Sequence, residues 1–143
     1  MSTSAELLLF DTSAALAFVD VEHPCHEQAW SLAATRRRGL SGHAAFEFLS
    51  VLTRLPLPKR LSGSDALRLV RAEFPDGRFL DQAQADALLD EFVALGIAGG
   101  MVYDGLVGAC ARAHGLTLLT CDLRAEDTYR ALGVAYQLVR EEI

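Results

Sequence analysis

Residues 116–122 have the sequence LTLLTCD, and residues 7–11 have the sequence LLLFD, so the chain contains two short apolar runs that each end on an acid. Short apolar runs bounded by turn-forming residues are typical of buried strands. We therefore expect strands at residues 7–10 and 116–120, followed by Asp11 and Asp122 respectively. These two stretches set the fold that we predict for the rest of the chain.

The remaining pattern is mostly helical, with a few further strands. Capping residues, prolines and glycines delimit helices that we expect at residues 14–19, 24–37, 43–55, 62–74, 81–95, 103–114 and 124–132. Gly39 is expected to stop the second of these helices, and strands are expected at residues 40–41 and 134–139. Strands that alternate with helices over short connections predict an α/β fold with a mainly parallel sheet of four to five strands. Ligands of such sheets bind beyond the carboxyl ends of the strands, where Asp11 and Asp122 are expected.

The composition excludes several classes of protein. The chain has 143 residues, of which 51% are apolar, so we expect one domain over residues 1–143 and not a disordered chain. No apolar run reaches the roughly 18 residues of a membrane span, and Met1 to Glu6 lack the basic stretch of a secretion signal. The three cysteines lack the spacing of a disulfide framework, which favours reduced thiols and a cytoplasmic location.

Charge is distributed unevenly along the chain. The net charge of −6 argues against a protein that binds nucleic acid through many cationic contacts, but it does not exclude an enzyme that contacts a few phosphates. Residues 36–71 contain eight basic residues and two acids, which gives this segment a local charge of +6. Arg36, Arg37 and Arg38 open it. The segment is either a solvated face or a basic lip beside an acidic site.

Two further acids lie within apolar helical sequence. Glu47 belongs to a polar stripe of the helix at 43–55, and Asp104 opens the helix at 103–114. Each of the four acids has an ordinary alternative role. Asp11 and Asp122 are suited to capping a helix, Asp104 to the positive end of a helix dipole, and Glu47 to facing solvent.

If the four acids converge, their mutual repulsion requires a cation. Hard oxygen ligands without clustered histidine or cysteine favour Mg²⁺ or Mn²⁺ over zinc. Such an ion activates a water and stabilises charge on a phosphoryl oxygen, so phosphodiester hydrolysis is the natural reaction. Thr12, Ser13 and Thr120 are candidates to hold a ligand water or an acid, or they are ordinary turn and strand residues.

Three segments resemble the PIN-domain ribonucleases, and specifically the VapC-like toxins of bacterial toxin–antitoxin pairs. They are residues 8–16 (LLFDTSAAL), residues 44–49 (AAFEFL), and residues 103–111 (YDGLVGACA) followed by residues 115–122 (GLTLLTCD). The order and spacing of the last segment are the most specific part of the resemblance. Residues 56–96 match only in their general helical character.

The resemblance implies a PIN-like three-layer α/β/α fold in which Asp11, Glu47 and Asp104 are the core acids and Asp122 is the fourth. It implies one or two Mg²⁺ or Mn²⁺ ions held by these acids, and cleavage of RNA. It also implies a homodimer and a VapB-like antitoxin, which together form a heterotetramer or a larger assembly. The chain departs from the family at Cys121, where many members have a basic residue, and at Gly105 and Gly108, where alanine is common.

Two other functions compete with a metal-dependent endoribonuclease. One is a non-catalytic interaction module of the same fold, which would keep the acids for stability and bind an antitoxin or RNA. The other is a phosphatase-type enzyme with Asp11 as its nucleophile. Ser13 stands where that chemistry usually has a second Asp, and Lys59, the sole lysine, is far from any expected strand end.

Overall fold

Four short parallel strands form one sheet in the computed structural model, which describes residues 6–141. The strands are β1 (Leu7–Phe10), β2 (Arg37–Leu40), β3 (Thr117–Thr120) and β4 (Tyr136–Leu138), in the order β2-β1-β3-β4. All neighbouring strands are parallel, which confirms the predicted sheet at the lower end of the expected number of strands. The expectation about a secretion signal concerns residues 1–5, which lie outside the described residues.

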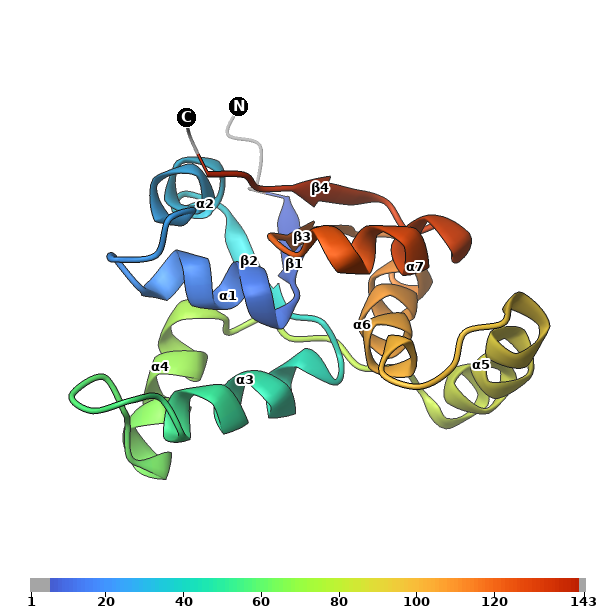
Figure 1. Ribbon diagram of the computed structural model, residues 1–143, viewed down its shortest axis with the longest axis horizontal. Coiled ribbons are helices and arrows are strands. Elements are labelled where there is room, and N and C mark those ends of the chain that lie inside the picture. Colours follow the sequence, from blue (N-terminus) through green and yellow to red (C-terminus); the bar gives the residue numbers. More distant parts are fainter. Residues whose placement is uncertain (1–5, 142–143) are drawn as a thin grey trace.

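In the described part of the chain, seven helices and one 3₁₀ turn surround the sheet (Figure 1). They are α1 (Thr12–Val19), α2 (His26–Ala33), α3 (Ala44–Thr53), α4 (Gly63–Glu73), α5 (Gln82–Leu95), α6 (Met101–Ala113), η1 (Leu123–Ala125) and α7 (Glu126–Ala131). Within residues 6–141, no helix has both the length and the apolar character needed to cross a membrane.

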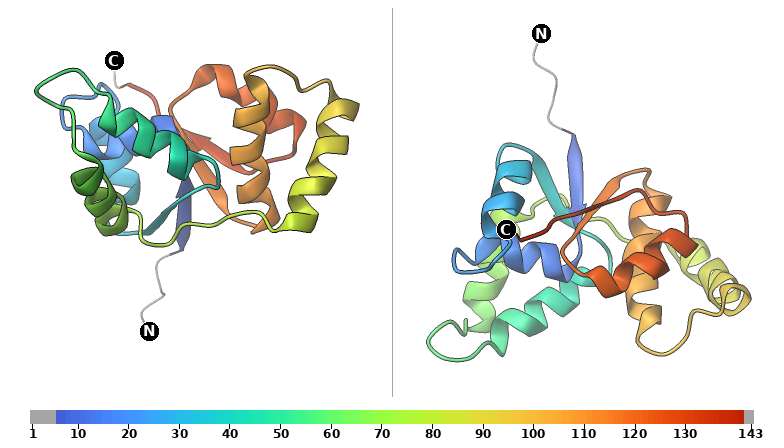
Figure 2. Two further views of the ribbon diagram at one scale, coloured as in Figure 1. Left: turned by 90° about the horizontal axis from the view of Figure 1, so that it is seen from below. Right: turned by 45° about the horizontal axis from the view of Figure 1, so that its top comes forward.

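The alternating side chains of β1 divide the core into two clusters, one on each face of the sheet. Leu8 and Phe10 pack with residues of α1 to α4, whereas Leu7 and Leu9 pack with residues of α5 to α7. All four side chains of β1 are buried, which is why its sequence is a continuous apolar run and not an alternating one. Helices therefore cover both faces, as the two views of Figure 2 also show, and the predicted three-layer architecture is confirmed.

The sequence prediction was wrong at the second helix and second strand. Helix α2 ends at Ala33, and residues 37–40 form β2 where the prediction extended the helix to 37 and began a strand at 40. Gly39 lies inside β2. A Cβ at this position would lie 2.0 Å from the Asp76 carbonyl oxygen, so a larger residue does not fit there. The close approach of a distant loop, not a helix end, therefore requires this glycine.

Two glycines of α6, at positions where the resembled family commonly has alanine, allow close packing of this helix. A Cβ at Gly105 would lie 2.6 Å from Cζ of Phe92, and one at Gly108 would lie 2.8 Å from Cδ1 of Tyr129. Both aromatic rings are buried, so neither can move into solvent to make room. Helix α6 is thus held tightly against α5 and α7.

Candidate active site

The parallel register brings the carboxyl ends of β1 and β3 to the same edge of the sheet, which we call the carboxyl edge. Phe10 pairs with Leu119, and the backbone N–H of Asp11 donates to the Leu119 carbonyl over 3.1 Å. Asp11 therefore lies beside the end of β3, from which Asp122 follows two residues later. The sequence prediction that these two acids share one edge is confirmed.

Asp11 is almost fully enclosed, with 5% of its surface exposed. Its Oδ1 accepts hydrogen bonds from the Ser13 hydroxyl (2.6 Å) and the Ala14 N–H (2.9 Å), and its Oδ2 accepts one from the Tyr129 hydroxyl (2.9 Å). Burial raises the pKa of Asp11, while the hydroxyls of Ser13, Thr120 and Tyr129 and the N–H of Ala14 act in the opposite direction. The bond from Ala14 also makes Asp11 the N-cap of α1, so the capping role exists alongside the shared edge.

The turn after β3 is fastened to the turn after β1. The Cys121 N–H donates to the Ser13 hydroxyl (2.8 Å), and the Asp122 N–H donates to the Thr120 hydroxyl (3.1 Å). Asp122 in turn caps η1 through a 2.9 Å bond from the Arg124 N–H to its Oδ1. Ser13 and Thr120 therefore position the two acidic turns. Thr12 Oγ1 is buried and has no hydrogen-bond partner within residues 6–141.

Asp104 is the acid whose pKa responds to the charges of the other three carboxylates. It lies in the first turn of α6 and is partly buried. Burial, followed by the charges of Asp122, Asp11 and Glu47, raises its pKa to about 6, and Arg124 opposes the shift. The structure thus brings the four predicted acids into one electrostatic neighbourhood. Glu47 is its exposed outer member, so a solvent-facing position and proximity to the other acids are both true of it.

The donor set of this neighbourhood suits a hydrated divalent cation better than a protein cage. Within residues 6–141, no three His, Cys, Asp or Glu side chains are arranged to ligate one ion together. Mg²⁺ commonly keeps several waters and is held by one or two carboxylates, so it does not require such a cage. Asp104 carries the repulsion of three other acids, which a cation would relieve. The residues present therefore fit Mg²⁺ or Mn²⁺.

Sequence reasoning missed two residues of the site. Tyr129 is 1% exposed and donates its hydroxyl to Asp11, and this contact raises its pKa further above the value that burial already imposes. Its position, four residues after Ala125 and three before Leu132, was a usable signal, because a phenol on the apolar face of a helix needs a buried acceptor. Arg124, whose Nε lies 3.6 Å from Asp122 Oδ1, is 94% exposed at the mouth of the site.

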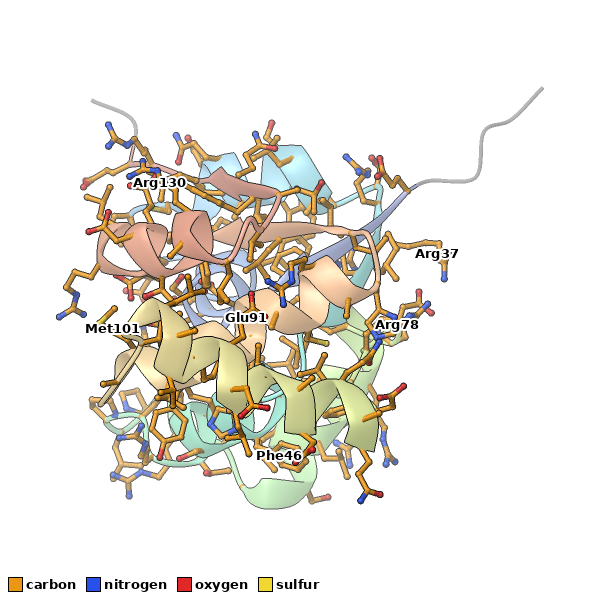
Figure 3. The ribbon with its side chains drawn as sticks, turned by 90° about the vertical axis from the view of Figure 1, so that its right-hand side faces the viewer. Arg37, Phe46, Arg78, Glu91, Met101 and Arg130 are labelled. Carbon is orange, nitrogen blue, oxygen red and sulfur yellow. The ribbon has the colours of Figure 1, made fainter. Side chains whose placement is uncertain are left out.

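The basic-lip interpretation is wrong for residues 36–38. They precede or begin β2, and since Leu7 pairs with Arg37, they lie at the edge where β1 starts, opposite Asp11. Figure 3 shows Arg37 on the side from which the N-terminal strand enters. Arg38 is internal, with its guanidinium donating to the carbonyls of Ala33 and Glu73 and lying 4.5 Å from the centre of the Phe18 ring.

Comparison with known proteins agrees with this fold. Residues 8–131 match the PIN domain family. The chain is 39% identical to ribonuclease VapC27 of Mycobacterium tuberculosis over 127 residues, which are 89% of this chain and 93% of the relative. It is 40% identical to ribonuclease VapC40 of the same organism over 131 residues, which are 90% and 96% of the two chains. The chain belongs to the PIN-domain family.

Solved structures share the architecture at lower sequence identity. DNA-bound VapBC from Salmonella typhimurium superposes with a TM-score of 0.65 at 18% identity, covering 93% of this chain and 97% of that one. FitAcB from Neisseria gonorrhoeae superposes with a TM-score of 0.63 at 20% identity, covering 90% and 95%. These likenesses establish the fold.

Proposed function

We propose that the protein is a Mg²⁺- or Mn²⁺-dependent endoribonuclease and the toxin of a type II toxin–antitoxin pair. The observation that carries this proposal is that the parallel register places Asp11 and Asp122 at the same edge of the sheet. Asp104 and Glu47 lie close enough to act on this cluster, since burial, and then the charges of Asp122, Asp11 and Glu47, raise the pKa of Asp104. The names of the relatives VapC27 and VapC40, at about two fifths identity over most of the chain, support ribonuclease activity.

The side chains divide the work by depth. One or two of Asp11, Asp104 and Asp122 would ligate the hydrated cation directly and the rest through its waters, and the exposed Glu47 would orient water at the outer side. A bound divalent cation supplies an acidified water and stabilises charge on the phosphoryl oxygen. Arg124, next to Asp122 and open to solvent, is placed to contact an RNA phosphate.

A cleavage assay tests this proposal. Purified protein is incubated with single-stranded RNA in Mg²⁺, in Mn²⁺ and in excess EDTA, and the product ends are mapped. We expect cleavage with either ion, none with EDTA, and none from Asp104→Asn while its circular dichroism matches the parent. Metal-independent cleavage would contradict the proposed chemistry. Absence of cleavage under all conditions, with RNA or antitoxin still bound, would identify the non-catalytic interaction module instead.

We propose an apolar groove as the binding site of the antitoxin. It encloses about 600 Å³ between α1, α3 and α4, which lie side by side in Figure 2, and its walls include Leu16, Leu52, Leu61 and Leu69. Charged side chains, among them Lys59, line it as well. Amphipathic helices dock into grooves of this kind. The VapBC complexes among the structural neighbours support a VapB-like partner.

Co-expression with a VapB-like protein encoded beside the gene tests this partner. We expect Leu69→Glu, at a partly exposed wall of the groove, to abolish co-purification, and Leu89→Glu, at an exposed leucine on α5, to leave it intact. Light scattering then gives the assembly, for which we propose a homodimer and a heterotetramer or larger complex with antitoxin. Binding that survives Leu69→Glu would place the antitoxin elsewhere. We further propose that the protein acts in the cytoplasm, where its three free thiols stay reduced.

A further inference from the structure

The direct hydrogen bonds of Asp11 are divided unevenly between its two oxygens. An ionised carboxylate has about four lone-pair sites, two on each oxygen. Ser13 Oγ and the Ala14 N–H, at 2.6 and 2.9 Å, occupy those of Oδ1. Oδ2 receives one direct hydrogen bond, from the Tyr129 hydroxyl at 2.9 Å. The Thr120 hydroxyl also stabilises the ionised carboxylate.

The tyrosine that defines this arrangement is held firmly. Tyr129 belongs to α7, and its ring packs directly on the backbone of α6 at Gly108, where a Cβ would lie 2.8 Å from Cδ1 and 3.2 Å from Cε1. The Tyr136 ring is 5.7 Å away on another side. A ring enclosed in this way keeps its hydroxyl in one place. The absence of a side chain at position 108 is therefore what lets the hydroxyl of Tyr129 reach Asp11.

We propose that Tyr129 is a positioning residue that fixes the orientation of the Asp11 carboxylate, through which Asp11 would ligate the cation, and that Gly108 provides the space for its ring. The inference rests on the proposed metal-dependent function. It assigns to Tyr129 an effect on the cation that passes through Asp11 without direct contact. Hydrogen-bonded partners of ligating side chains commonly alter metal affinity by 10–100-fold when they are removed.

Binding of Mn²⁺ to the full chain, measured by calorimetry and by electron paramagnetic resonance, tests the inference without relying on cleavage. Tyr129→Phe keeps the ring and removes the hydroxyl, and we expect it to weaken Mn²⁺ binding about tenfold or more. Tyr136→Phe is the matched control, because it removes another phenol–carboxylate bond, 3.0 Å to Glu126 Oε1, away from the acids. It should leave Mn²⁺ affinity unchanged.

A thermodynamic cycle separates positioning from general packing. In an Asp11→Asn background, Tyr129→Phe should cause no further loss of Mn²⁺ affinity, since its effect passes through the Asp11 carboxylate. An additional loss of the same size in that background would overturn the inference. Equal Mn²⁺ affinities of the parent and Tyr129→Phe, with or without a fall in thermal stability, would also overturn it and leave the nuclease proposal standing.

A second substitution keeps the test decisive if Tyr129→Phe does not fold. Gly108→Ala would press a methyl group against the ring and displace the hydroxyl, so it should also weaken Mn²⁺ binding, whereas unchanged affinity would contradict the inference. If the parent protein binds no Mn²⁺ and cleaves no RNA, the proposed function fails and this inference fails with it.

Discussion

The two ends of the sheet, the one where the strands begin and the carboxyl edge where they finish, differ in how their charged side chains are arranged. At the edge where β1 and β2 begin, each arginine has a nearby acid: Arg36 with Glu6 at 3.5 Å, Arg37 with Asp76 at 3.3 Å and Arg38 with Glu73 at 3.3 Å. At the carboxyl edge, four acids share one neighbourhood, and Arg124 approaches Asp122 over 3.6 Å from an exposed position. Charge is locally matched at the first edge and accumulates at the second.

This difference indicates which edge has a function beyond folding. Exposed matched pairs contribute at most about 1 kcal/mol each to folding, and their opposite charges largely cancel at the position of a ligand. Like charges held together destabilise the chain that contains them, and here they add to burial in raising the pKa of Asp104. Ionisable groups with perturbed pKa values concentrate at functional sites for this reason. A divalent cation would give the carboxyl edge the neutralisation that the other edge already has.

The largest effect on RNA cleavage should come from removing an acid at the carboxyl edge, with removal of an acid at the opposite edge as the control. Asp104→Asn is expected to lower RNA cleavage on the order of 10³-fold, more than the 10–100-fold typical of residues that only support a ligand. Asp76→Asn removes an acid of the opposite edge, paired with Arg37, and should leave cleavage unchanged. Initial rates with labelled RNA at saturating Mg²⁺ measure both. Equal losses would mean that the edges do not differ in function.

Arg38 should have the largest effect on stability at the matched edge. Its side chain is 14% exposed, and its guanidinium donates to four carbonyl oxygens and to the Glu73 carboxylate. Arg38→Met removes these hydrogen bonds from partly buried acceptors, so we expect a loss of about 2–4 kcal/mol in the free energy of unfolding.

Urea denaturation measures this loss, with Arg68→Met as its control. Arg68 also pairs with an acid, Asp65, but its side chain is 76% exposed, so its replacement should cost less than about 1 kcal/mol. Cleavage per folded molecule should not change in either variant. A loss for Arg38→Met no larger than for Arg68→Met would show that burial adds nothing at this edge.

The pH dependence of stability tests the accumulated charge at the carboxyl edge. The pKa of Asp104 is about 6 in the folded chain against 3.8 for an ordinary Asp. The folded state therefore binds the proton more tightly, so this stabilisation is present below pH 4 and is lost as the pH rises through 6. After discounting for solvent screening, we expect the loss to be on the order of 1–2 kcal/mol.

Urea unfolding in EDTA at several pH values from 4 to 7.5 measures this loss. Asp104→Asn should remove it, so the parent should lose more stability than the variant across this range. Saturating Mn²⁺ should reverse the trend, because the ionised acids bind the cation. Parallel pH profiles of parent and variant in EDTA would contradict the coupling among the acids.

The same two edges show where sequence reasoning succeeded. Strands β1 and β3 were predictable because they are central, and burial on both faces forces a continuous apolar run. The acids at their ends follow from the parallel topology. The expectation that Asp104 and Glu47 lie near these two acids rested on the family resemblance, because helical spacing alone does not determine where two helices meet.

Sequence reasoning failed where distant segments decide the structure. Strand β2 is an edge strand with the sequence RRGL, which has no apolar run, and Gly39 is required there by the loop at Asp76. The pairing of Arg36 to Arg38 with distant acids was equally invisible, so a cluster of positive charge was taken as a possible RNA surface. Tyr129 was overlooked because its acceptor, Asp11, is 118 residues away.

The smallest expected effect is on RNA binding, and it compares the removal of arginines at the two ends of the sheet. Arg36→Gln with Arg37→Gln removes two charges at the matched edge, and we expect neither the affinity for RNA nor its salt dependence to change. Arg124→Gln removes one charge at the carboxyl edge, where a phosphate contact should lower the slope of log affinity against log salt by about 1. Both are measured by fluorescence anisotropy with the non-cleaving Asp104→Asn chain. If the double variant flattened the slope more than Arg124→Gln does, RNA would extend across both edges, and the division of the molecule into a matched and a functional edge would have to be abandoned.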